Sequence, residues 1–207
     1  MEAGTARFRT GAGRICLDFT RTLRYRGRPG ETEELPDQVA LAAWLRQFGP
    51  GLPERLPTPA QLALARRLRE AVHEMITAAR GGAAGPPAAL DVVNAAASRA
   101  LPAPRIDAGG QLSWHAADPV AAVLALVARD ALDLVTSQAA GRLRECANPD
   151  CRVLFLDNSR PGARRWCDMS TCGNQAKKAA FRGRPGGSVE ADRLLRQAQR
   201  LQAGEAG

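Results

Sequence analysis

Four of the chain's five cysteines lie close together in two pairs of identical spacing. The first pair, Cys146 and Cys151, reads CANPDC, and the second pair, Cys167 and Cys172, reads CDMSTC. Four residues separate the cysteines within each pair, and fifteen residues separate the pairs. Zinc prefers a tetrahedron of sulfur or nitrogen ligands, and four thiolates leave no position open for catalysis. The spacing therefore predicts one structural Zn²⁺ held by these four cysteines.

Two other uses of the cysteines are possible in principle, namely disulfide bonds or unrelated buried thiols. The odd total and the repeated spacing favour a metal site over both. The N-terminal segment has no apolar run typical of a secretory signal, and the apolar stretch 120–128 is too short to span a bilayer. We therefore expect a cytoplasmic protein without membrane association, in a compartment where thiols stay reduced.

The residues around the cysteines predict a small zinc module. Turn-forming residues occupy 148–150 within the first pair, and 152–157 reads as a strand that leaves this turn. Residues 164–166 return the chain to the second pair, and a helix is expected to begin near Cys172. The expected order of knuckle, hairpin, knuckle and helix is like that of treble-clef zinc modules. A segment of this size has little core of its own, so the metal should supply much of its stability.

The positive charge of the chain is concentrated around the cysteines. The net charge is +8, and residues 142–184 carry ten Arg/Lys against four Asp/Glu, a surplus of +6. A clustered basic segment favours a nucleic-acid partner, although a solvated charged face is the ordinary alternative. The residues predicted to contact DNA are Arg164, Arg165, Asn174, Lys177, Lys178, Arg182 and Arg184.

The part before the cysteines is rich in alanine and leucine, which favours helices. Apolar periodicity predicts helices over 35–49, from Thr58-Pro59 to Gly81, over 87–100, and from Asp118-Pro119 directly toward Cys146. Residues 105–115 predict a β-hairpin that turns at Gly109-Gly110. The fold class is thus mainly α, with a helical domain over 1–141, a small β-hairpin, the zinc module over 142–184, and a linker with a terminal helix or tail over 185–207.

No catalytic motif is visible, and we predict that the protein is not an enzyme. His73 lies off the apolar stripe and is expected to be solvated, whereas His115 is expected to have a surface or packing role. Cys16 is expected to be a small buried residue. A ligand pocket for an unknown small-molecule effector is predicted around Asp18, Arg21, Trp44 and Trp114.

The segment RWCDMSTCGNQAKK, together with CANPDCRVLFLDNSR before it, resembles the CGNR zinc finger. CLDFTRT and DQVALAAWL resemble the N-terminal ABATE domain, which accompanies this finger in bacterial proteins described as stress-induced transcription regulators. Gln175 stands where the finger family has arginine, which removes one charge. Thr20 and Arg21 stand where the ABATE motif has valine and asparagine, which implies an altered or absent ligand if that segment lines a pocket.

The resemblance and the charge together predict a DNA-binding transcription regulator whose helical domain senses a signal or mediates assembly. A protein–protein interaction adaptor without DNA binding is the alternative. Because a single small finger gives limited specificity, a homodimer is also expected.

Overall fold

The computed structural model covers the chain of 207 residues and describes residues 8–50, 55–106 and 108–182. By contacts, the chain divides into two compact units, which meet in sequence between Asp168 and Met169. The linker and terminal helix predicted over 185–207 lie outside the described residues, as does Arg184.

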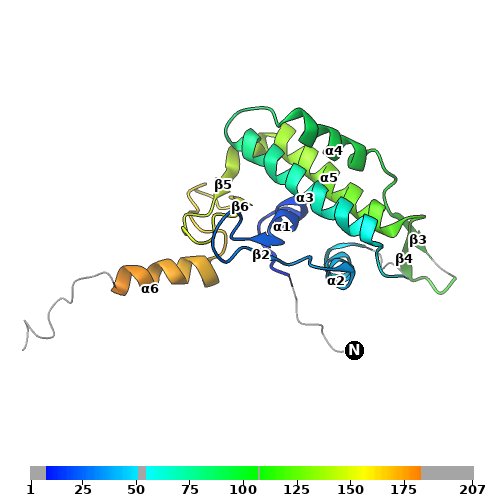
Figure 1. Ribbon diagram of the computed structural model, residues 1–207, viewed down its shortest axis with the longest axis horizontal. Coiled ribbons are helices and arrows are strands. Elements are labelled where there is room, and N and C mark those ends of the chain that lie inside the picture. The colour runs from blue at the N-terminus through cyan, green and yellow to red at the C-terminus, as the bar shows by residue number, and fades with distance from the viewer. Residues whose placement is uncertain (1–7, 51–54, 107, 183–207) are drawn as a thin grey trace, which may run out of the picture. The chain divides into compact units, whose positions relative to one another are not determined.

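Three helices form the main layer of the first unit (Figure 1). They are α3 (Pro59–Arg80), α4 (Pro87–Ala97) and α5 (Pro119–Thr136), and each packs against the other two. Thr58 caps α3 with its side chain, which accepts a hydrogen bond from the backbone N–H of Gln61, while the Gln61 side chain accepts one from the Thr58 N–H. The predicted apolar stripe of α3, from Leu62 to Ile76, is buried. The helices predicted from sequence are therefore confirmed here, except that α4 and α5 both end earlier than expected.

Two shorter helices complete the core. In α1 (Ile15–Thr20), every residue after the first is buried, and the helix packs against α3 and α5. In α2 (Gln38–Phe48), Trp44 is fully buried, and its ring lies 4.8 Å from the rings of both Phe19 and Phe48. Cys16 is also fully buried, as predicted.

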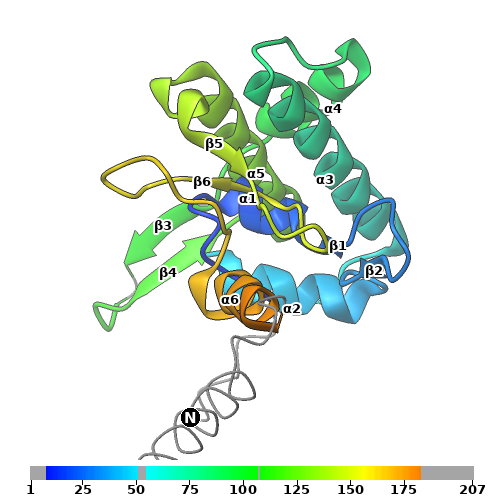
Figure 2. The ribbon, with the colours of Figure 1, turned by 90° about the vertical axis from the view of Figure 1, so that its left-hand side faces the viewer.

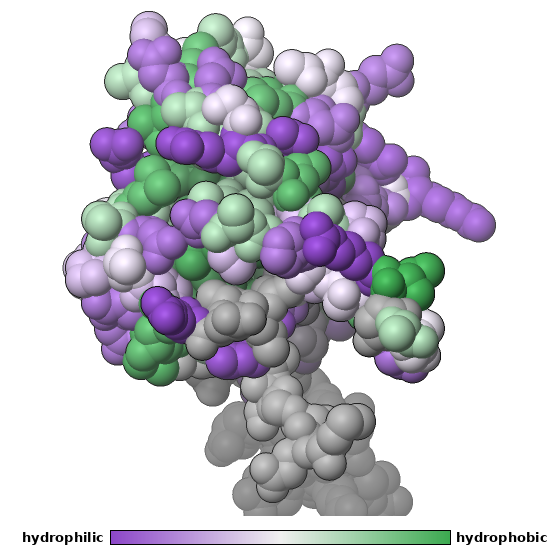
Figure 3. All heavy atoms as spheres, turned by 90° about the vertical axis from the view of Figure 1, so that its right-hand side faces the viewer, coloured by the Kyte–Doolittle hydropathy of each residue, from purple (hydrophilic) through white to green (hydrophobic). Residues whose placement is uncertain are grey.

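Two small hairpins flank the helices. One pairs β1 (Leu23–Arg24) with β2 (Thr32–Glu33), and the other pairs β3 (Ala103–Ile106) with β4 (Leu112–His115), all antiparallel. The second confirms the hairpin predicted from sequence, and every residue in its strands is exposed. Among them are Ile106, Leu112 and Trp114, which place apolar surface on this side of the molecule. Figure 3 shows that side, where apolar residues interrupt a mostly hydrophilic surface.

The connection from α5 to the cysteines differs from the prediction. The helix ends at Thr136, because Ser137 takes an extended conformation, and a 3₁₀ turn (Gln138–Arg142) follows. The next strand, β5 (Leu143–Glu145), pairs with β6 (Leu154–Leu156). The strand expected over 152–157 therefore exists as β6, but its partner precedes the first cysteine, so the hairpin encloses the first cysteine pair and does not follow it as expected. Figure 2 shows β5 and β6 beside α1.

The described part of the second unit is helical. A π-helical turn (Met169–Gly173) is followed by α6 (Asn174–Arg182), which confirms the helix predicted near Cys172. The fold class is thus mainly α with small hairpins and a C-terminal four-cysteine cluster, as predicted. Within the described ranges, no helix combines the length and the apolar character that a membrane crossing requires.

Candidate metal centre and an arginine-lined cavity

The first cysteine pair lies in the turn that joins β5 to β6. The turn closes through a hydrogen bond of 2.9 Å from the Cys151 N–H to the Asn148 carbonyl. The Asn148 side chain accepts a further bond of 3.0 Å from the Asp150 N–H. Arg152 follows with a φ of 47°, a left-handed conformation that reverses the chain direction after the second sulfur. The prediction of a tight turn at 148–150 is confirmed.

Asp157 organises the loop that leads from β6 to the second pair. Its carboxylate is fully buried and accepts hydrogen bonds from the Ser159 N–H, the Ser159 hydroxyl and the Arg164 N–H, at 2.6–2.9 Å. These bonds, chiefly that from Ser159, lower the pKa of Asp157 to about 2. The loop is thereby folded back, which brings Cys167 near the first pair.

The returning segment contacts the first turn directly. The Ala147 N–H donates to the Arg165 carbonyl at 2.8 Å, and the Cys167 N–H donates to the Cys146 sulfur at 3.5 Å. Backbone N–H donation to a ligating sulfur is a usual feature of thiolate sites because it stabilises negative charge.

The four predicted ligands come together. The Sγ atoms of Cys146, Cys151, Cys167 and Cys172 all lie within 4.8 Å of one another, and those of Cys151 and Cys167 are 3.6 Å apart. In a tetrahedral site with Zn–S bonds of about 2.3 Å, neighbouring sulfurs would be roughly 3.8 Å apart. Three of the cysteines are buried and Cys151 is partly buried. Donor type, number and spacing therefore fit one structural zinc ion.

The thiols also affect one another's protonation in a way that favours a cation. The pKa of Cys146 is lowered because the thiols of Cys151 and Cys167 donate hydrogen bonds to it. The pKa values of Cys151 and Cys167 are raised, because each lies beside the Cys146 sulfur, which is better stabilised as the thiolate. Thiolates this close together repel one another. A divalent ion among the sulfurs offsets that repulsion and permits all four thiols to ionise.

The hairpin formed by β5, β6 and the turn that carries Cys146 and Cys151 is called the zinc hairpin below. It contacts the N-terminal segment of the chain. The Leu156 N–H donates to the Ala12 carbonyl at 2.8 Å, so residues 11–13 lie along the free edge of β6. Gly13 has a φ of +97°, and a Cβ built on it would lie 3.0 Å from the Leu156 Cβ. The Ala12 N–H donates to Asp18 at 2.9 Å, which connects this contact to α1. The hairpin is thus part of the first unit and not an independently packed element.

The structure places the residues predicted to contact DNA in different surroundings. Arg165 is exposed beside the ring of Trp166, and Asn174, Lys177 and Lys178 are exposed on α6. Arg164 instead donates to the carbonyls of the second knuckle and lies over the Phe155 ring, which gives it a bracing role. The side chain of Arg182 lies outside the described part of the chain, like Arg184.

The four residues predicted to form a ligand pocket have separate roles. Asp18 and Arg21 are buried and form an ion pair at 3.3 Å. Trp44 belongs to the core, and Trp114 is 41% exposed on β4. Their grouping into one ligand site stays a prediction. Arg21 also donates to the Thr10 carbonyl at 3.1 Å and so supports the segment that contacts β6.

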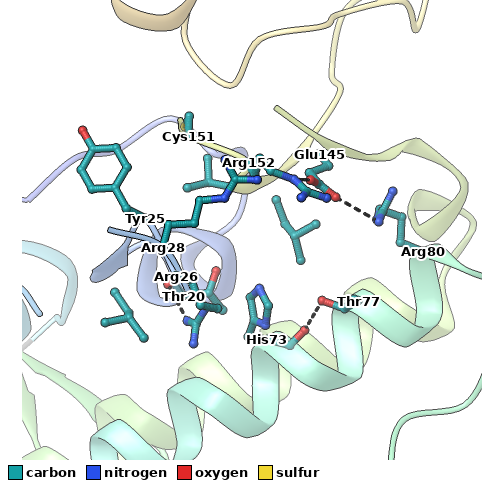
Figure 4. A pocket seen from close by; sticks show the side chains of 13 residues that line it. Thr20, Tyr25, Arg26, Arg28, His73, Thr77, Arg80, Glu145, Cys151 and Arg152 are labelled. Atoms are coloured by element: carbon teal, nitrogen blue, oxygen red, sulfur yellow. Dashed lines mark hydrogen bonds and ion pairs between the residues drawn. The ribbon is translucent and has the colours of Figure 1, made fainter. Parts of the chain in front are cut away.

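Sequence reasoning missed a cavity of about 290 Å³ between β1, α3 and the zinc hairpin (Figure 4). Four arginines line it: Arg26, Arg28, Arg80 and Arg152. The expectation for His73 was wrong, because this side chain is partly buried and faces the cavity (Figure 4). Burial and the charge of Arg26 lower the pKa of His73 to about 4. His115, by contrast, is exposed, as expected.

A sequence signal for this cavity exists along α3. Arg66, Arg69, His73, Thr77 and Arg80 recur at helical spacing and form a polar stripe beside the apolar one. Arg69 is 3% exposed and forms a bidentate pair with Glu33 of β2 at 2.6 and 2.7 Å. A polar stripe that contains a buried arginine indicates a packed surface, and the last three residues of the stripe line the cavity.

Fold and site together define a helical protein that carries a four-cysteine zinc finger. The chain belongs to the ABATE family, described as "Putative stress-induced transcription regulator", whose model matches residues 13–138. The model of the CGNR zinc finger matches residues 142–185. Both findings confirm the resemblances read from the sequence. A search of curated proteins returned no match to the chain.

Proposed function

We propose that this zinc-binding regulator is a DNA-binding transcription factor, in which the zinc module supplies contacts to the phosphate backbone. The observation that supports this most is the +6 surplus over residues 142–184. The only two lysines of the chain, Lys177 and Lys178, are adjacent and exposed on α6. Cations at such positions neutralise phosphates and release counterions on binding. The family description, which names a transcription regulator, supports the same function.

Each predicted domain has its own role in this proposal. Residues 1–141 sense a signal or mediate assembly, and residues 142–184 contact DNA. In this proposal the protein acts in the reducing cytoplasm, where thiolates stay available for zinc, and it is not an enzyme. Both matched families are described as regulator and zinc finger, which accords with a non-catalytic role. A homodimer would double the phosphate contacts, and the exposed apolar residues of the β3–β4 hairpin offer it a surface.

The test is DNA binding by the zinc-loaded full-length protein across a salt series, measured by fluorescence anisotropy. Each phosphate contact contributes about −0.9 to the slope of log K against log salt. The double variant Lys177→Gln/Lys178→Gln should therefore bind more weakly and have a slope shallower by up to about 2. The matched control is Arg67→Gln, an exposed arginine on α3, which should leave the slope unchanged.

An adaptor function predicts a different outcome from the same material. The adaptor alternative is supported by the apolar residues exposed on the β3–β4 hairpin, a surface suited to a protein partner. If the zinc-loaded protein shows no DNA binding at low salt, or binding that does not respond to salt, the DNA-binding proposal fails. Capture of a defined acidic protein partner in that case would establish the adaptor function.

A further inference from the structure

We propose that the arginine-lined cavity binds a compact organic dianion, either a phosphate monoester or a dicarboxylate. This assigns a ligand class and a location to the effector, and it does not depend on DNA binding. None of the four pocket residues predicted from sequence lines this cavity, although Thr20, which does, is the last residue of α1 and lies next to Arg21 in the chain.

Three separate parts of the first unit supply cationic side chains to the cavity. Arg26 and Arg28 come from the loop after β1, Arg80 comes from the last turn of α3, and Arg152 comes from the zinc hairpin. In Figure 4, the ring of His73 projects from α3 into the space below Arg28 and Arg152. Because the arginines come from distant points in the sequence, only the folded chain brings their charges together.

The charges that line the cavity are unequal. Against four guanidinium groups the lining contains one carboxylate, that of Glu145, which Arg80 and Arg152 share. Arg28 donates to a neutral group, the carbonyl of Pro149 in the first zinc knuckle. Arg26 pairs with Glu70, which lies outside the lining, so the charges at the cavity sum to a surplus of two positive charges, which a ligand with two negative charges would offset.

Burial is the main influence on the protonation of the neighbouring groups. Burial, and after it the charge of Arg69, lower the pKa of Arg26 to about 10, although Glu31, Glu33 and Glu74 act to raise it and Glu70 pairs with it. His73 faces Arg26 on one side and Glu145 on the other, and it stays neutral at pH 7. A neutral imidazole can donate one hydrogen bond and accept another, which suits an anion that carries hydroxyl or ester oxygens.

The chemistry and size of the lining limit the ligand. A guanidinium group presents paired N–H donors that match the oxygens of a phosphate or a carboxylate. Leu23, Val153 and Leu154 provide an apolar part of the wall, which suits a carbon skeleton and not a bare inorganic ion. The volume of about 290 Å³ is at the lower end for small-molecule sites, so the ligand is compact.

The cavity also shares residues with the metal centre. Cys151, a zinc ligand, is part of its lining, and the acceptors of Arg28, Arg80 and Arg152 all belong to the first zinc turn or to β5. An anion that recruits these arginines would draw them from Glu145 and Pro149. Ligand and zinc should therefore affect each other's binding, and such a coupling is reciprocal.

The test is isothermal titration calorimetry on zinc-loaded full-length protein with phenyl phosphate, succinate and inorganic phosphate as probes. We expect saturable binding of one phenyl phosphate or one succinate per chain, tighter than that of inorganic phosphate. Preference for phenyl phosphate would identify the ligand as a phosphate ester, and preference for succinate would identify it as a dicarboxylate. Absence of saturable binding by both organic dianions would overturn the proposal.

Substitution of the lining arginines tests whether the dianion binds in the cavity. Arg28→Gln and Arg80→Gln should each weaken binding by at least about tenfold, because each removes a charge-assisted contact. Arg67→Gln is the matched control on α3, and as an exposed substitution it should change binding by less than about twofold. Equal weakening by all three would mean that only the general charge of the protein is sensed, and the proposal would fail. Since the assay contains no DNA, its failure would leave the DNA-binding proposal standing, and the reverse also holds.

Discussion

Substitution of Gly13 by alanine is the sharpest test of the contact between the N-terminal segment and the zinc hairpin. Two costs are expected. The φ of +97° disfavours any residue with a Cβ, which costs about 1–2 kcal/mol. The new Cβ would also lie 3.0 Å from the Leu156 Cβ and 3.3 Å from the Leu156 carbonyl oxygen. Overpacking of this kind adds about 1–3 kcal/mol, so the free energy of unfolding should fall by about 2–5 kcal/mol.

Gly11 provides a matched control for the backbone term. Its φ is +93°, but a Cβ built there has no atom within 4 Å. Gly11→Ala should therefore cost only the backbone strain of about 1–2 kcal/mol. The difference between the two variants in the free energy of unfolding therefore measures the contact with β6.

The assay is urea unfolding of the zinc-loaded full-length protein, with the rate of zinc transfer to a coloured chelator as a second readout. Gly13→Ala should release zinc faster than Gly11→Ala, because it displaces the strand that follows the first cysteine pair. Equal destabilisation and equal zinc release in the two variants would refute the inferred contact.

Three further outcomes follow from the described side chains. Purified reduced protein should contain one zinc ion per chain by atomic emission, and Cys167→Ser should lower that content and the thermal stability together; full zinc content in the variant would contradict the four-sulfur assignment. The folded pKa of His73, about 4, lies below its unfolded value of about 6.5, so stability should be intact above pH 6.5 and fall by up to about 3 kcal/mol as the pH drops toward 4. His73→Gln should flatten that part of the stability–pH curve, and an unchanged curve would exclude His73 as its cause. Arg69→Met should lower the free energy of unfolding by about 2–3 kcal/mol in urea, less than a fully buried pair because Glu33 is 29% exposed; a cost near zero would show that the pair contributes no net stability.

Local signals predicted most of the helical fold correctly. Thr58 and Pro59 mark the start of α3, because side-chain capping and the fixed φ of proline act within a few residues. Gly81 marks the end of α3, because glycine is favoured just after a helix. The four cysteines were also found by local spacing. These features need no knowledge of distant contacts.

The errors concern features that depend on distant contacts. The sequence predicts a strand over 152–157 but does not identify its partner, and the backbone hydrogen bonds of the fold pair it with 143–145, before the first cysteine. His73 was expected in solvent because it lies off the apolar stripe, but on the same polar stripe Arg69 is buried and Thr77 lines the cavity. The cavity arginines carry no individual mark in a chain with 29 Arg/Lys, since their convergence arises only on folding.

The attachment of β6 to Ala12 has a practical consequence for anyone who dissects this protein. A fragment that begins at the finger boundary would lose the neighbour of one strand edge and expose the apolar side chains of Leu154 and Phe155. If such a fragment aggregated or bound zinc more weakly, the cause would be the truncation and not a property of the native module. Recombinant work on this finger should therefore retain residues 11–13, even though they lie more than a hundred positions upstream.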